Sequence, residues 1–147
     1  MNSRINLKNI KALFALVILC AANLNSVAQT PDPGLVGTHA VLKGQYNLGD
    51  AAYTPPAAAA FSWAMEVRGS VHYPADIATM GPMPVLVWLH GRHSTCYSTT
   101  TLSPSSAWPC PTGRLPILSY EGYDYAARTM ASHGYIVISI SANSINA

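Results

Sequence analysis

Apolar and polar residues alternate in two stretches of the chain. The first runs from Ala40 to Leu48 and the second from Ser62 to Tyr73, with a Pro-rich and Ala-rich connector between them. A period of two turns one face of a strand toward a core and the other toward water. We therefore expect two antiparallel strands. In the second, the core face would carry Met65, Val67, Val71 and Tyr73, and the water face Glu66, Arg68, Ser70 and His72.

Two later stretches, Val85–Leu89 and Tyr135–Ile140, are nearly continuous apolar runs. Such runs are typical of parallel strands that helices cover on both faces. Between them, apolar residues recur at helical spacing at Tyr123, Ala127, Met130 and Ala131. Ser119 is a candidate N-cap, and Gly134 stands where a left-handed residue commonly ends a helix. The pattern predicts a strand–helix–strand crossover.

Antiparallel edge strands that lead into such a crossover predict an α/β fold with a parallel, doubly wound sheet. One helix cannot cover both faces of this sheet, so Trp88, Ile136 and Ile138 would be left partly exposed. We therefore expect residues 29–147 to be the N-terminal part of a longer, incomplete α/β domain.

The N-terminal residues have the three parts of a signal peptide. Basic residues precede an apolar run from Ala12 to Ala22, and Ser26-Val27-Ala28 forms a small-residue cleavage site. We expect residues 1–28 to be removed and the mature protein to be secreted, to the periplasm or the cell exterior, without a membrane span. An uncleaved anchor and lipid attachment at Cys20 are the alternatives.

Cleavage changes the charge balance. Five basic and six acidic side chains remain, so the net charge falls from +2 to −1. Nucleic-acid binding requires clustered Lys and Arg and is not expected. Cys96 and Cys110 would meet in an oxidising compartment, where we expect them to form a disulfide. A metal site formed by His90, His93 and Cys96 is the alternative, but we expect neither a metal ion nor a cofactor.

The first apolar run ends in His90-Gly91, and the predicted helix ends in Ala131-Ser132-His133-Gly134 before the second run. Between about Val67 and Asn143, this arrangement resembles the secreted esterases of the α/β-hydrolase family, which include cutinase-like polyester hydrolases and platelet-activating-factor acetylhydrolases. The resemblance implies a partial α/β-hydrolase fold and a small-molecule or polymeric ester as substrate.

The resemblance also implies roles for the residues after the first apolar run. A backbone N–H in this loop would stabilise the oxyanion of acyl transfer, from Arg92 or, with the turn offset by one residue, from His93. Gly91 would let the substrate approach the backbone. The alternative is that Gly91 only forms a tight strand exit and that His90 packs structurally.

The sequence departs from the family pattern in three places. No Gly is followed two positions later by Ser, so the nucleophile elbow and its triad are absent. Arg92 stands where the polyester hydrolases have an aromatic residue, which puts polyester cleavage in doubt and would suit an anionic ester or an acidic partner. The segment from Ser94 to Leu118 is long for its position.

We expect this long segment to form part of the substrate rim, with Tyr97 and Trp108 as apolar faces and Asn143 nearby at the sheet edge. A flap whose Trp108 only plugs the surface is the alternative. The sequence thus predicts the N-terminal portion of an exported serine esterase or lipase-like hydrolase, inactive alone. A secreted, non-catalytic binding module with a disulfide-closed recognition loop is the second hypothesis.

Overall fold

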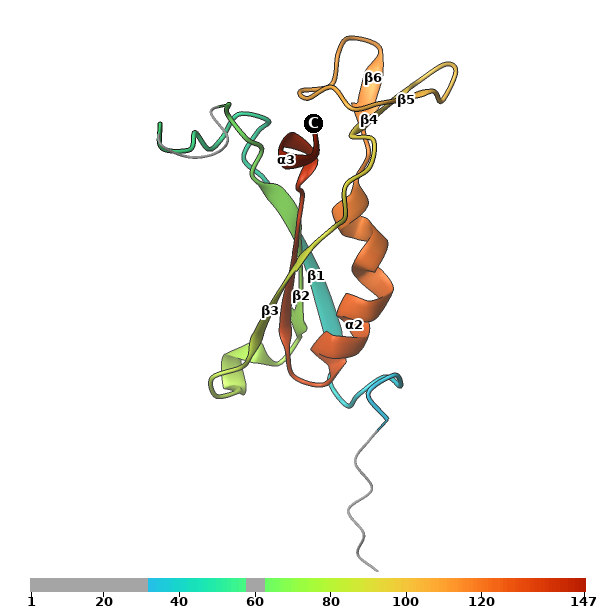
Figure 1. Cartoon of the computed structure of the whole chain (residues 1–147). Helices are drawn as coiled ribbons and strands as arrows, with labels where there is room; N and C mark the ends of the chain where they lie inside the picture. The colour runs from blue at the N-terminus through green and yellow to red at the C-terminus, as the bar shows by residue number, and fades with distance from the viewer. Residues whose placement is uncertain (1–31, 58–62) are drawn as a thin grey trace, which may run out of the picture. The chain divides into compact units, whose positions relative to one another are not determined.

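The computed structural model describes residues 32–57 and 63–147 (Figure 1). The predicted signal peptide, residues 1–28, lies outside the described residues. The strands are β1 (Val41–Asn47), β2 (Arg68–Pro74), β3 (Val85–Leu89), β4 (Cys96–Ser98), β5 (Pro104–Ser105), β6 (Arg114–Pro116) and β7 (Ile136–Ile140). The helices are the 3₁₀ turns η1 (Ile77–Thr79) and η2 (Ser119–Tyr123), and α2 (Asp124–Ser132) and α3 (Asn143–Asn146).

The larger sheet has the strand order β1-β2-β7-β3. β1 pairs antiparallel with β2, and β2 pairs antiparallel with β7. β3 pairs parallel with β7 and is joined to it by a connection that contains α2. The predicted antiparallel pair and the predicted strand–helix–strand crossover are both confirmed. β2 begins at Arg68 rather than Ser62, and before it Met65 forms only an isolated bridge with Tyr53.

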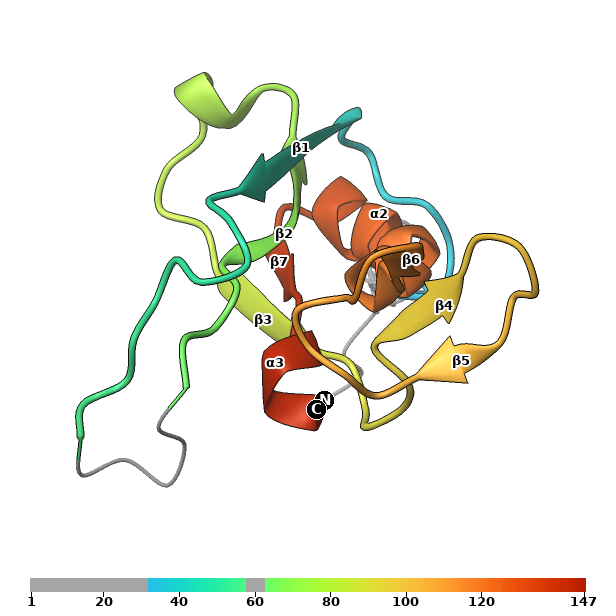
Figure 2. The same cartoon turned by 90° about the horizontal axis from the view of Figure 1, so that it is seen from above.

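The prediction of a parallel, doubly wound sheet is wrong. The larger sheet is mixed, with β3 and β7 as its one parallel pair, and the second sheet, β5-β4-β6, is antiparallel. A doubly wound sheet has helices on both faces. Here α2 lies on one face, and no described helix or strand lies over the other (Figures 1 and 2). The nearly continuous apolar run of β3 therefore does not mean that both faces of this strand are buried.

The polar side of β2 faces the helix, contrary to prediction. Arg68 is 7% exposed, and Ser70 and His72 are fully buried. The connection between two parallel strands fixes which face its helix covers, and β2 presents its polar side on that face. Ala127 and Ala131 of α2 are fully buried there. The alternation correctly predicts a strand, but the side of the strand that α2 covers is the polar side and not the apolar one.

The opposite side of the sheet, which we call the open face, is mainly apolar. Its residues share a face through the strand register and are Leu42, Tyr46, Val71, Tyr73, Ile136, Ile138, Ile140, Val85, Val87 and Leu89. Val85, Val87 and Leu89 are 53%, 56% and 54% exposed. Trp88, Ile136 and Ile138, which we expected to be partly exposed, are all half-buried. Within the open face, the large apolar side chains of β3, at the edge of the sheet, are therefore the most exposed.

The ends of α2 agree only in part with prediction. Gly134 has a φ of +93° and directly follows the C-cap His133, as predicted. Ser119 is not an N-cap, because η2 begins there and α2 begins only at Asp124. The Ser132 hydroxyl accepts a hydrogen bond from the Gly37 N–H at 2.7 Å. This bond joins the end of α2 to the segment before β1.

Candidate oxyanion site

The segment Gly91–His93 follows β3 at its carboxyl end and is accessible. Gly91, Arg92 and His93 are all exposed. A Cβ added at Gly91 would meet no atom within 4 Å. Packing against the described residues therefore does not require glycine at position 91. The absence of a side chain leaves the backbone of Gly91–His93 open to approach.

The backbone donors of this segment are free. In residues 32–57 and 63–147, the N–H groups of Arg92 and His93 donate to no protein acceptor. An N–H without a protein partner is bonded to water or to a ligand. Both donors that the sequence suggested are therefore unpaired within the described residues, and the choice between Arg92 and His93 stays open.

His90 holds this segment in place. Its side chain is 7% exposed. Its Nε2 accepts a hydrogen bond from the Ala142 N–H at 2.9 Å, and its Nδ1–H donates to the Gly91 carbonyl at 3.0 Å. Burial lowers the pKa of His90 below its ordinary value, although the bond to the Gly91 carbonyl opposes this. The ring is therefore neutral and has a defined tautomer.

Two further contacts fix the segment. The Asn146 side-chain amide donates to the Gly91 carbonyl at 3.1 Å, and the His93 ring stacks on His90 with the ring centroids 4.9 Å apart. The structure therefore shows a structural role for the His90 side chain, as the sequence alternative held. Through these contacts, His90 fixes the position of the N–H groups of Arg92 and His93.

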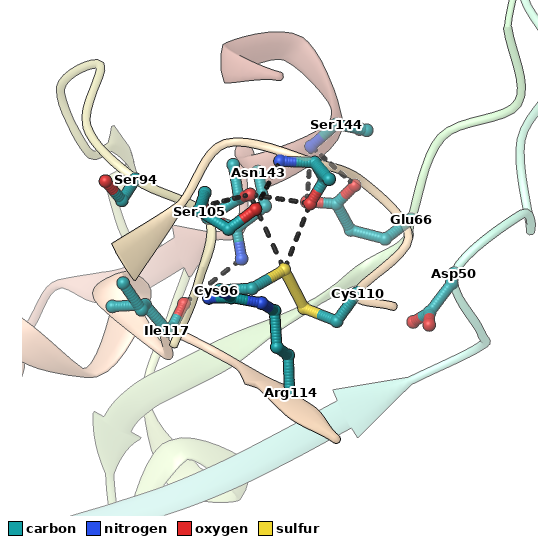
Figure 3. The surroundings of a disulfide bond; sticks show 12 residues. Asp50, Glu66, Ser94, Cys96, Ser105, Cys110, Arg114, Ile117, Asn143 and Ser144 are labelled. Carbon is teal, nitrogen blue, oxygen red and sulfur yellow. Dashed lines mark hydrogen bonds between the residues drawn. A yellow bond between two sulfur atoms is a disulfide. The ribbon is translucent and has the colours of Figure 1, made fainter. Parts of the chain in front are cut away.

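Glu66 connects the start of β2 to α3. Its buried carboxylate accepts hydrogen bonds from the Ser141 hydroxyl at 2.9 Å and from the Ser144 N–H at 3.0 Å (Figure 3). Neither Glu66 nor Asn146 was predicted to support this segment. The alternation from Ser62 to Tyr73 placed Glu66 on the water face, and no helix was predicted after about Ser141. The carboxylate stabilises the α3 turn, from which Asn146 reaches Gly91.

The disulfide between Cys96 and Cys110 is present, with the two Cα atoms 5.8 Å apart. It lies in a segment that forms the small sheet β5-β4-β6 instead of an irregular loop. Among the described residues, no group of three His, Cys, Asp or Glu side chains could hold a metal ion. The alternative metal site is not formed, since Cys96 is bonded to Cys110.

An apolar hollow of about 370 Å³ lies beside the small sheet. It is lined by Tyr97, Leu115, Pro116, Ile117 and Leu118. The Ile117 N–H donates to the Thr95 carbonyl at 2.8 Å, so the wall of the hollow is bonded to the strand that leads back to His93. Tyr97 thus lies in an apolar depression, four positions along the chain from His93, and its role as a rim residue stays a prediction.

Trp108 and Asn143 are placed differently from Tyr97. Trp108 is half-buried, and the Arg68 guanidinium lies 5.3 Å from its ring centroid. Arg68 also forms an ion pair with Asp50. Asn143 is 1% exposed, and its amide donates to the Ile117 carbonyl at 3.1 Å (Figure 3). Trp108 therefore packs against the Arg68 guanidinium, and Asn143 is bonded to the wall of the hollow; the rim role of both residues stays a prediction.

No helix within the described ranges is long and apolar enough to cross a membrane. Comparisons of the chain with protein-family models, with curated proteins and with solved structures give no match.

Proposed function

We propose that this chain supplies the oxyanion-binding part of an exported serine esterase or lipase-like hydrolase, whose nucleophile comes from outside residues 32–147. One observation carries the proposal: in the exposed segment Gly91–His93, the N–H groups of Arg92 and His93 have no acceptor among the described residues, on a backbone that His90 and Asn146 hold in place. Preorganised donors of this kind stabilise charge that develops in a transition state.

The proposed reaction is acyl transfer. A serine hydroxyl attacks the ester carbonyl carbon and loses its proton to a base, and the carbonyl oxygen becomes an oxyanion that accepts hydrogen bonds from the Arg92 or His93 N–H. The carbon–oxygen bond to the alcohol then breaks, and the alcohol leaves with the proton. Water hydrolyses the acyl-enzyme in a second, equivalent cycle. The described chain contributes the donors and has no Gly-x-Ser-x-Gly sequence.

The surroundings of the segment suit an ester substrate. The hollow between Tyr97 and Leu118 offers about 370 Å³ of apolar space, which is within the range of small-molecule sites. The disulfide and the small sheet hold this hollow in a defined shape. We assign the hollow to the apolar part of the ester.

The larger sheet supports the view that another segment completes the site. β3 pairs only with β7 among the described residues, and its outer edge carries no charged residue. Natural edge strands are commonly protected by charges, Pro or bulges. A second hollow of about 420 Å³, lined by Val87, Trp88, Leu89, Tyr123 and Ala126, lies along this strand. An open edge and an open face are what a partial domain would present.

The test compares two proteins in the hydrolysis of p-nitrophenyl butyrate. The first is the product of the uninterrupted reading frame, that is, the protein translated without a stop after Ala147, and it should hydrolyse the ester. The second is the chain that ends at Ala147, and its rate should not exceed the background rate. In the active protein, Arg92→Pro and His93→Pro each remove one N–H, and Arg92→Ala and His93→Ala keep it. Loss of the functional donor should lower kcat by about 10²- to 10³-fold.

One of the two proline variants should therefore be far less active than its alanine control, with circular dichroism spectra unchanged. Turnover by the chain ending at Ala147 would contradict the proposal. Equal activity of all four variants would contradict it as well, because the reaction would then not depend on either N–H.

The disulfide-closed small sheet, with its own hollow, favours a second candidate function: a secreted, non-catalytic module that binds a polymer or a partner protein. This module would unfold cooperatively as a soluble monomer of residues 29–147 and would not bind hydrophobic dye. Dye binding and aggregation of the same protein would favour the partial hydrolase.

A further inference from the structure

The cations of the described chain fall into two groups. Lys43 contacts the Asp124 carboxylate at 2.5 Å, Arg68 forms an ion pair with Asp50, and Arg114 donates to the Ser103 carbonyl at 2.7 Å. Arg92 and Arg128 are exposed and have no acidic or carbonyl partner within residues 32–57 and 63–147. These two guanidinium groups are therefore exposed and unpaired within the part of the chain that the structure describes.

Arg92 differs from Arg128 in its place. Arg128 lies on the exposed side of α2, far along the chain from the candidate site. The Arg92 side chain belongs to the residue whose own N–H is a candidate oxyanion donor. Glu66 acts electrostatically on the neighbouring His90, and its buried carboxylate is already bonded to Ser141 and Ser144. Arg92 is thus an uncompensated positive charge beside the reacting position.

We propose that the Arg92 guanidinium binds a carboxylate on the substrate, and that the preferred substrates are half-esters of dicarboxylic acids. This inference rests on the proposed function, since it concerns the substrate class of the same site. A guanidinium binds a carboxylate through two parallel N–H···O bonds, with greater geometric specificity than an ammonium group. An ester with its carboxylate a few carbons from the carbonyl could occupy the free N–H group and the guanidinium together.

The test uses two substrates with acyl chains of equal length, p-nitrophenyl butyrate and p-nitrophenyl hydrogen succinate. The ratio of their kcat/KM values is measured on the product of the uninterrupted reading frame. An exposed ion pair should favour the succinate half-ester by about fivefold. Arg92→Gln should abolish this preference, Arg92→Lys should restore part of it, and Arg128→Gln should leave the ratio unchanged.

A second measurement does not depend on a variant. The preference of the unmodified protein should decrease between about 0.01 M and 1 M salt, because the screening length falls from about 30 Å to about 3 Å. If the butyrate ester is hydrolysed but the ratio shows no preference, or if Arg92→Gln leaves it unchanged, the inference is overturned and the proposed function stands. If neither ester is hydrolysed, both are overturned.

Discussion

The contacts of His90 predict that its removal destabilises the domain much more than removal of His93. His90→Ala leaves the buried Ala142 N–H without its acceptor, since that bond of 2.9 Å is made to the imidazole Nε2. The Gly91 carbonyl keeps its bond from Asn146 and loses only one of two donors. A buried donor left without a partner costs about 1–3 kcal/mol, and a lost hydrogen bond costs about 1 kcal/mol more.

We therefore expect His90→Ala to lower the free energy of unfolding by about 2–4 kcal/mol. The matched control is His93→Ala, because His93 is exposed, stacks on His90 and should cost about 0.5 kcal/mol or less. Urea unfolding followed by circular dichroism measures both values from the shift in midpoint at constant slope. Equal effects of the two variants would refute the assignment of His90 as the anchor of the segment.

Further predictions concern pH, the disulfide and the open face. Burial lowers the pKa of His72 and of His90 below the ordinary 6.5, so the unfolded chain binds more protons than the folded one at acidic pH. The urea midpoint should be constant above about pH 7.5 and decrease as the pH falls below about 6.5, and His72→Gln should weaken this decrease. A midpoint that rises on acidification would contradict it. Replacing Cys96 and Cys110 by Ser should lower the free energy of unfolding by about 3 kcal/mol, measured by thermal unfolding with and without reductant; an unchanged midpoint would count against a stabilising disulfide. Val87→Lys should reduce dye binding and aggregation of residues 29–147, because Val87 is 56% exposed on the open face. Leu102→Lys, at a 71% exposed position near the small sheet, is its control and should change neither quantity.

The sequence predicted the local parts of the fold well. The crossover from β3 through α2 to β7 could be predicted from two apolar runs and a helical period. Gly134 was recognised because few other residues adopt a positive φ at a helix end. The disulfide was predicted from two cysteines in a chain that we expected to be exported.

The sequence misled where burial depends on distant partners. The alternation of β2 placed Ser70 and His72 toward water, but α2, more than fifty positions later, covers that side. A period of two gives the faces of a strand and does not say which face a helix will cover. An uncovered face was expected, because one helix cannot cover both sides of the sheet, but the apolar run of β3 did not show that Val85, Val87 and Leu89 would be the exposed side chains.

The candidate site was predicted in part. The structure shows an exposed backbone at Gly91–His93, and the role of this segment as oxyanion donor stays a prediction. The contribution of Glu66 and Asn146 could not be predicted, because they act through α3, which brings together residues far apart in the chain. Asn143 was expected at the rim, and its burial follows from the same helix.

The proposed function requires that a backbone N–H at Arg92 or His93 receives a negatively charged oxygen. The most direct measurement is a crystal structure of the product of the uninterrupted reading frame after reaction with diethyl p-nitrophenyl phosphate, which leaves a phosphoryl group on an activated serine. We predict that the phosphoryl oxygen lies about 2.7–3.1 Å from the nitrogen of Arg92 or His93. An adduct whose oxygen is bound by other donors, with the segment Gly91–His93 still in water, would contradict the account.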